Sequence, residues 1–240
     1  MFAALSLVGG SVLADPNTSF TYSLPPAAWS SINFDTAMYR LHLNRLQQNN
    51  SEGAGGSSSS EQVLRKPQAG LLAQSTRYTP AIRDGDYAHK LADAYPAQSR
   101  GEAERVFKEL LSGYRKLEAR FGIPRNDVAG SIAAFLAGSY MAYHDTDFPD
   151  EHFRPLVEQM RTVVGSNADF ARATEAEKQE MYEKMAMLGM YMATTQMALK
   201  EQPNPQVSVN MKKAAKTYLE QFLKADADSV EITARGLVIR

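Results

Sequence analysis

The densest group of side chains able to bind a metal ion lies in one acidic stretch, residues 144–152. His144, Asp145, Asp147 and His152 could supply imidazole nitrogens and carboxylate oxygens as ligands. The stretch lacks the glycine and the distal glutamate of a calcium-binding loop, and no histidine pair has the spacing of an HExxH zinc site. Acidic residues are also common where a helix begins, because the helix dipole is positive there. We therefore favour a solvated helix start and keep metal binding as the alternative.

Three glutamates at intervals of three residues, Glu177, Glu180 and Glu183, form a second group. Two such carboxylates could serve as general acid and general base, for example in the cleavage of a glycan. A run of acids in the first turns of a helix is more often a solvated face near the positive end of the helix dipole. We therefore favour a structural role for these glutamates.

Glu183 differs from the other two glutamates because it stands at the start of a long segment that is otherwise uncharged. If its side chain is buried, it needs a partner such as Arg83 or Arg154. Gln179 and Tyr182 would then belong to the same buried polar network. We expect this network to serve packing, since paired buried acids commonly do so.

The composition excludes several classes of chemistry. The chain has no cysteine, and so no disulfide, zinc–thiolate site or thiol nucleophile. It has no GxSxG elbow, Walker loop or dinucleotide fingerprint, and we expect no cofactor. Its 26 Lys and Arg residues nearly balance 27 Asp and Glu residues, which leaves no field to attract nucleic acid. These absences favour a non-catalytic binding or scaffolding protein. The alternative is an envelope hydrolase or metal-dependent enzyme that uses residues 144–152 or Glu183.

Two uncharged segments, residues 128–143 and 185–199, must form the elements that position these side chains. Apolar residues recur at helical spacing in both segments, and a helix that is apolar nearly all round is buried nearly all round. Both segments are shorter than the roughly 20 apolar residues of a membrane span. The sequence therefore predicts two central core helices and no membrane span.

Small residues at four-residue spacing predict how these two helices pack. Gly130, Ala134 and Gly138 form a ridge without large side chains, which lets two helix backbones approach closely. We expect this ridge to contact the small side of the second helix, which carries Ala186, Gly189 and Ala193.

Further helical patterns surround this pair, the clearest of them over residues 101–120. Residues 229–239 alternate in polarity and predict one strand, or two strands that turn at Arg235-Gly236. We predict a mainly α fold: a helical bundle of five or six helices around two central apolar helices, with a small C-terminal β element and an irregular N-terminal arm. The helical domain should span residues 63–240.

The N-terminal residues have the composition of a signal peptide. Residues 1–14 are apolar and end in Val12-Leu13-Ala14, a small-x-small pattern that is typical of a cleavage site. The mature chain would then begin near Asp15 and be exported, to the periplasm or out of the cell. A short buried strand is the alternative interpretation of this segment.

Two further segments precede the helical domain. Residues 15–48 are rich in aromatic side chains and form the predicted arm, and residues 49–62 have the Gly/Ser composition of a flexible linker. The arm could bind a protein partner. Alternatively, it packs on its own domain, because most large apolar side chains are buried.

Three stretches resemble a family of exported bacterial proteins of unknown function. They begin with Asn126-Asp127-Val-Ala, with Glu177-Lys-Gln-Glu-Met-Tyr-Glu and with Ala225-Asp-Ala-Asp-Ser-Val-Glu-Ile-Thr-Ala-Arg-Gly. The resemblance covers about residues 78–237 and leaves the arm and the linker outside. It implies a secreted helical domain and no assigned chemistry.

Overall fold

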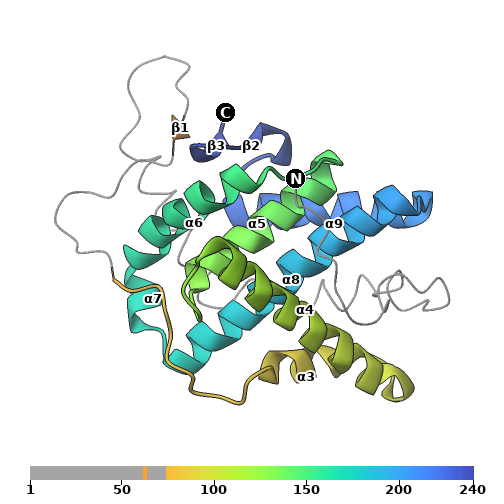
Figure 1. Ribbon diagram of the computed structural model, residues 1–240, viewed down its shortest axis with the longest axis horizontal. Coiled ribbons are helices and arrows are strands. Elements are labelled where there is room, and N and C mark those ends of the chain that lie inside the picture. The colour runs from red at the N-terminus through yellow and green to blue at the C-terminus, as the bar shows by residue number, and fades with distance from the viewer. Residues whose placement is uncertain (1–61, 64–73) are drawn as a thin grey trace.

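The computed structural model describes residues 62–63 and 74–240, and this part of the chain is mainly helical (Figure 1). The predicted signal peptide, the aromatic arm and all of the linker except its last residue lie outside the described residues. Seven α-helices occur in the described part: α3 (Asp86–Ala92), α4 (Arg100–Phe121), α5 (Val128–His144), α6 (Asp150–Gly165), α7 (Ala168–Arg172), α8 (Glu175–Glu201) and α9 (Pro205–Leu223).

The predicted fold class is confirmed, with one helix more than the sequence indicates. The additional helix, α7, has five residues, which is too short for an apolar periodicity to be recognised. It begins because the side chain of Asn167 accepts from the backbone N–H groups of Asp169 and Phe170.

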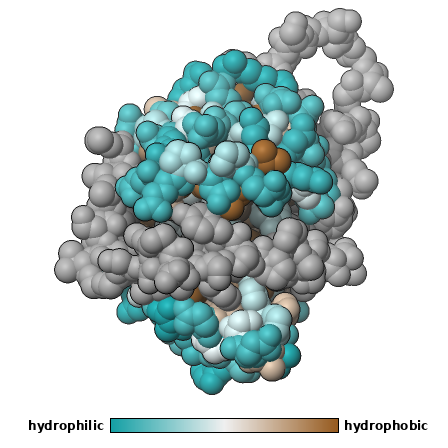
Figure 2. Space-filling view, turned by 90° about the vertical axis from the view of Figure 1, so that its right-hand side faces the viewer, coloured by the Kyte–Doolittle hydropathy of each residue, from teal (hydrophilic) through white to brown (hydrophobic). Residues whose placement is uncertain are grey.

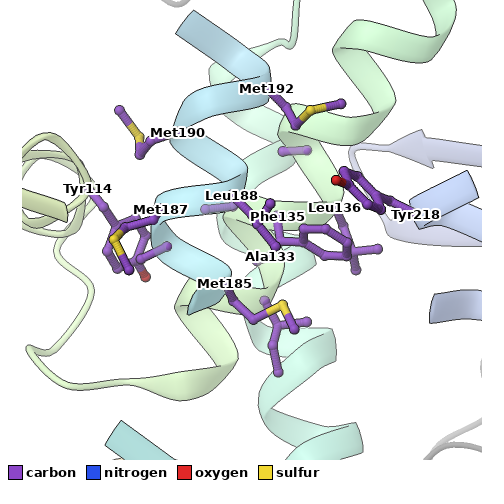
Figure 3. Close-up of a cluster of buried hydrophobic side chains, with 14 of the residues drawn as sticks. Tyr114, Ala133, Phe135, Leu136, Met185, Met187, Leu188, Met190, Met192 and Tyr218 are labelled. Atoms are coloured by element: carbon purple, nitrogen blue, oxygen red, sulfur yellow. The ribbon is translucent and has the colours of Figure 1, made fainter. Parts of the chain in front are cut away.

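The two uncharged helices form the centre of the domain, as predicted. α5 and α8 lie against each other, and α4, α6 and α9 pack around them (Figure 1). α5 is buried without interruption from Val128 to Ser139, and α8 from Met181 to Met190. The buried methionines of α8 project from opposite sides of the helix: Met187 points toward the side on which Tyr114 of α4 lies, and Met192 points to the other side (Figure 3).

The predicted ridge of small residues is confirmed at two of its three positions. A Cβ atom on Gly138 would overlap the carbonyl oxygen of Gly189, and a Cβ atom on Gly189 would lie 2.5 Å from the carbonyl carbon of Ala134. The backbones of α5 and α8 therefore touch. Gly130 does not face α8, because a Cβ atom there would lie 2.8 Å from the hydroxyl oxygen of Tyr114 in α4.

The C-terminal β element is a hairpin of β2 (Val230–Thr233) and β3 (Gly236–Ile239). A third strand, β1 (Gln62–Val63), pairs antiparallel with the other edge of β3 and includes the last residue of the predicted linker. Gln159 of α6 attaches the hairpin to the helices. Its side chain accepts from the N–H of Leu237 at 2.7 Å and donates to the carbonyl of Leu237 at 2.9 Å.

The surface of the described part is mainly polar. Figure 2 shows that the coloured part of the face in view is mostly hydrophilic, with isolated apolar side chains. Within residues 74–240, one large apolar side chain is exposed, that of Val209 in α9. No helix in these residues has the length and hydropathy needed to cross a membrane.

Candidate functional site

The polar residues at the N-terminal half of α8 form the first part of the candidate site, and the helix start fixes their position. The Thr174 hydroxyl accepts from the backbone N–H of Glu177 at 3.2 Å, and the Glu177 carboxylate accepts from the backbone N–H of Thr174 at 2.7 Å. This reciprocal pair of hydrogen bonds is a capping box. The Glu177 carboxylate is therefore engaged in capping the start of α8.

One face of α8 carries three polar residues at intervals of four: Glu175, Gln179 and Glu183. We call them the polar ladder, because four-residue spacing places their side chains above one another. An extended segment, residues 74–85, runs along this face, and we call it the strap. Its backbone donates to every member of the ladder, beginning with Thr79, whose N–H donates to the Glu175 carboxylate.

The middle member of the ladder holds the strap through both ends of its amide. The oxygen of the Gln179 side chain accepts from the N–H groups of Ala81 and Ile82 at 3.0 and 3.1 Å. Its nitrogen donates to the carbonyl of Ile82 at 3.2 Å and to the Glu183 carboxylate at 3.1 Å. Gln179 is buried, and its amide pairs with backbone N–H and C=O groups of the strap in the way that a neighbouring β-strand would.

Glu183 binds the N-terminal end of α3. It is fully buried, and its two oxygens accept from the N–H groups of Gly85 and Tyr87, each at 3.0 Å. The backbone N–H groups at a helix N-terminus have no partner within the helix, and the helix dipole there favours a negative charge. Gly85 has φ 73°, the left-handed region that glycine adopts at little cost.

The expected cation beside Glu183 is absent from its hydrogen-bond partners in the described part of the chain. Arg83 is exposed, and its guanidinium lies 3.9 Å from the carboxylate of Asp86. Arg154 donates to the carbonyl of Phe121 at 3.0 Å. The structure thus brings Gln179 and Glu183 together as predicted and leaves Arg83 outside, because the end of α3 supplies the donors.

Tyr182 belongs to a second buried site on the other side of α8. Its hydroxyl donates to Oε2 of Glu118 in α4 at 2.9 Å. Only 1% of Glu118 is exposed, and its other carboxylate oxygen has no hydrogen-bond partner among the described residues. Burial raises the pKa of Glu118 to about 7. Sequence reasoning missed this residue, although it follows Tyr114 by four positions and therefore lies on the buried face of α4.

The third buried acid, Asp127, is tied to its surroundings more completely. It is the N-cap of α5 and accepts from the N–H of Ala129 at 3.1 Å. The Thr76 hydroxyl in the strap donates to it at 2.6 Å, and the Arg161 guanidinium in α6 donates to it at 2.7 Å. Asp127 therefore joins the strap, α5 and α6 at one point.

Asp145 and Asp147, the two acids considered as alternative metal ligands, have separate partners. Asp145 accepts from the side-chain amide of Gln196, and Asp147 forms an ion pair with Lys200 at 2.8 Å. Both partners lie in the C-terminal half of α8. The two carboxylates thus fix the loop after α5 to α8.

The two histidines of that stretch lie against aromatic rings. The centroid of the His144 ring is 4.3 Å from that of Tyr140, and burial lowers the pKa of His144. The His152 ring is 6.1 Å from the ring of Phe148. Across residues 62–63 and 74–240, no three His, Asp or Glu side chains converge closely enough to hold a metal ion.

The three glutamates considered as an acid–base group also have separate partners and separate structural roles. Glu177 caps α8, Glu180 accepts from Lys90 of α3 at 3.0 Å, and Glu183 binds the end of α3. Each carboxylate bonds a different group of the protein itself. The arrangement holds α3, the strap and α8 together.

These features define a mainly helical protein whose described polar sites bind backbone and side-chain groups of the same chain. The chain belongs to a family of unknown function, DUF6683, which matches residues 3–240. The match includes the arm and the linker, so the expectation that they lie outside the family is wrong. No curated protein and no solved structure matches the chain.

Proposed function

We propose that this chain is an exported, non-catalytic binding or scaffolding protein. In this proposal the helical domain is a platform, and the aromatic residues of segment 15–48 bind a protein partner outside the cytoplasm. The proposal rests mainly on one observation, the way in which the strap is fixed to the domain.

The strap is bonded to three helices over a short distance along the chain. The N–H of Gln74 donates to the carbonyl of Gly165 at the end of α6, at 2.9 Å. The N–H of Val128 in α5 donates to the carbonyl of Thr76 at 3.0 Å, and the polar ladder of α8 binds the rest of the strap. The strap is therefore held at a fixed place on the domain, which suits a platform for the residues that precede it.

The composition of segment 15–48 supports binding through this segment. It carries five aromatic residues, among them Trp29, the only tryptophan of the chain. Tryptophan and tyrosine are enriched among the residues that contribute most binding energy at protein interfaces. Nothing in the described residues favours the enzymatic alternative, since the candidate acids are bonded to separate parts of the protein.

The binding proposal is tested with two aromatic substitutions in the full chain. The variant Trp29→Ala with Phe34→Ala is immobilised beside the wild type, and envelope extracts of the native host are applied to both. We expect recovery of the specific partner to fall about tenfold or more, since hot-spot truncations cost about 2 kcal/mol or more. The control is Val209→Ala, which changes an exposed residue of α9. Equal recovery by all three proteins would refute the role of the segment.

Export is tested separately by fractionation of the host and N-terminal sequencing of the chain. We expect the protein outside the cytoplasm, with Asp15 as its first residue. A chain that retains residues 1–14 in the cytoplasmic fraction would contradict export and leave the binding test unaffected.

A further inference from the structure

The three buried acids of the domain differ in how completely their oxygens are bonded. Glu183 accepts from two backbone N–H groups and one amide, and Asp127 accepts from a backbone N–H, a hydroxyl and a guanidinium. Glu118 accepts from one phenol hydroxyl, and Oε1 has no partner in the described part of the molecule. An unpaired buried carboxylate is costly in its charged form, whereas the neutral acid is much less so.

The charged groups near Glu118 do not change this situation. Arg115, one turn before it on α4, forms a bidentate pair with Asp84. The charges of Arg115 and Arg125 lower the pKa of Glu118, whereas the charge of Asp127 raises it. From α8, the Tyr182 hydroxyl lowers the pKa by its hydrogen bond, and burial outweighs all the lowering effects together.

Two tyrosines complete the surroundings of Glu118. Tyr114 of α4 is fully buried, and its hydroxyl has no partner among the described residues either. Tyr78 of the strap packs against Tyr182 with the ring centroids 5.2 Å apart and the ring planes tilted by 59°. Burial, and next the nearby carboxylates of Glu183 and Glu118, raise the pKa of Tyr78. Neither phenol supplies a positive charge to Glu118.

We propose that Glu118 is a buried proton-binding group, and that the neutral acid holds α4 against α8 while loss of its proton loosens this contact. The device lies at the junction of α4 and α8 and is distinct from the polar ladder that holds the strap. It makes the stability of the domain depend on pH below and around neutrality.

The direction of this dependence follows from linkage. The pKa of Glu118 is about 7 in the folded protein, against about 4.5 for an exposed glutamate. Between these values the folded state holds a proton that the unfolded state has released, so stability falls as pH rises. One such proton increases the unfolding equilibrium constant by up to about tenfold per pH unit. His144, with a lowered pKa, acts in the opposite direction, so the Glu118 effect is measured as a difference between variants.

The first experiment compares the full chain with Glu118→Gln, which keeps the shape and removes the titration. Urea unfolding of both proteins is followed by far-ultraviolet circular dichroism at pH 5, 6, 7 and 8. We expect the ratio of the unfolding constants, wild type over variant, to rise about tenfold or more from pH 5 to pH 7 and to level off by pH 8. A ratio that is constant with pH would overturn the proposal.

The second experiment observes the proton directly and does not depend on the folding of Glu118→Gln. Infrared spectra of the folded wild type should show a protonated carboxylic acid band that disappears with a midpoint near pH 7. Tyr182→Phe removes a hydrogen bond to the ionised carboxylate, and we expect it to raise this midpoint. The control is Tyr143→Phe, whose hydroxyl bonds Asp228 instead. Absence of the band, or a midpoint that Tyr182→Phe leaves unchanged, would overturn the proposal.

Discussion

Two buried glutamates lie at α8 but have different hydrogen-bonding environments. One is Glu183 of α8 itself, and the other is Glu118 of α4, which bonds the preceding residue of α8, Tyr182. Glu183 belongs to α8 and fills its hydrogen bonds from the end of α3, whereas Glu118 reaches α8 from α4 and meets only the hydroxyl of Tyr182. Both side chains are shielded from water almost completely. The difference lies in the donors. Backbone N–H groups are free to donate at the N-terminal end of a helix, whereas those along its side are already bonded within the helix. Burial alone therefore does not show what an acid does in a fold.

The largest expected effect comes from removing Glu183. In Glu183→Ala, the N–H groups of Gly85 and Tyr87 and the amide of Gln179 lose a buried acceptor. Each buried donor without a partner costs about 1–3 kcal/mol, and we expect the free energy of unfolding to fall by about 3–5 kcal/mol. Urea unfolding measures this value.

The matched comparison is Glu183→Gln beside Glu118→Gln at pH 7. Glu183→Gln should destabilise the domain, because its NH₂ group then faces backbone donors. Glu118→Gln should be neutral or stabilising, because it removes a charge that has no full set of donors. Similar losses in the two variants would show that the contrast between the two environments is wrong.

The second effect tests the helix crossing that positions both glutamates. A methyl group at residue 189 would lie 2.5 Å from the carbonyl carbon of Ala134, so Gly189→Ala must push α8 away from α5. We expect a loss of about 2–3 kcal/mol in unfolding free energy, despite a gain of about 1 kcal/mol in helix propensity. The control is Gly101→Ala in α4, where a Cβ atom meets nothing within 4 Å and stability should rise slightly. A stabilised Gly189→Ala protein would refute the backbone contact.

The helices and their crossing were accessible from the sequence because their signals are local. Thr174 and Glu177 mark the start of α8, Gly122 adopts φ 64° after α4, and Pro205 begins α9. Ala134 to Gly138 repeats small residues on the face that meets Gly189. Such features depend on residues a few positions apart, so a single sequence suffices to predict them.

The partners of the buried acids were not accessible in the same way. The sequence directs attention to a cation for Glu183, whereas its donors at Gly85 and Tyr87 are backbone groups nearly 100 residues away along the chain. Backbone donors have no residue type, so no pattern marks them. Glu118 carries a sequence signal, because it falls on the buried face of α4 with Tyr114, and that signal was overlooked.

A smaller effect tests how closely α3 must approach Glu183. Gly85 has φ 73°, and an alanine in the left-handed region costs roughly 1–2 kcal/mol. A Cβ atom there meets only the Lys108 side chain at 3.7 Å, so the cost is conformational and not a clash. We expect Gly85→Ala to lower the unfolding free energy by about 1 kcal/mol. Gly85→Asn should lose less, since asparagine tolerates this region. Equal losses would point to a steric cause instead.

The smallest effect sharpens the description of the Glu118 side of the comparison. The Tyr114 hydroxyl is buried without a partner in the described residues, whereas the Tyr182 hydroxyl donates to Glu118. Tyr114→Phe removes a polar group that has lost its hydration, and we expect unfolding free energy at pH 6 to stay constant or rise by up to about 1 kcal/mol. Tyr182→Phe should lower it by about 1 kcal/mol. Equal losses in both variants would mean that a buried water molecule already bonds Tyr114, and that the Glu118 environment is more polar than its protein partners indicate.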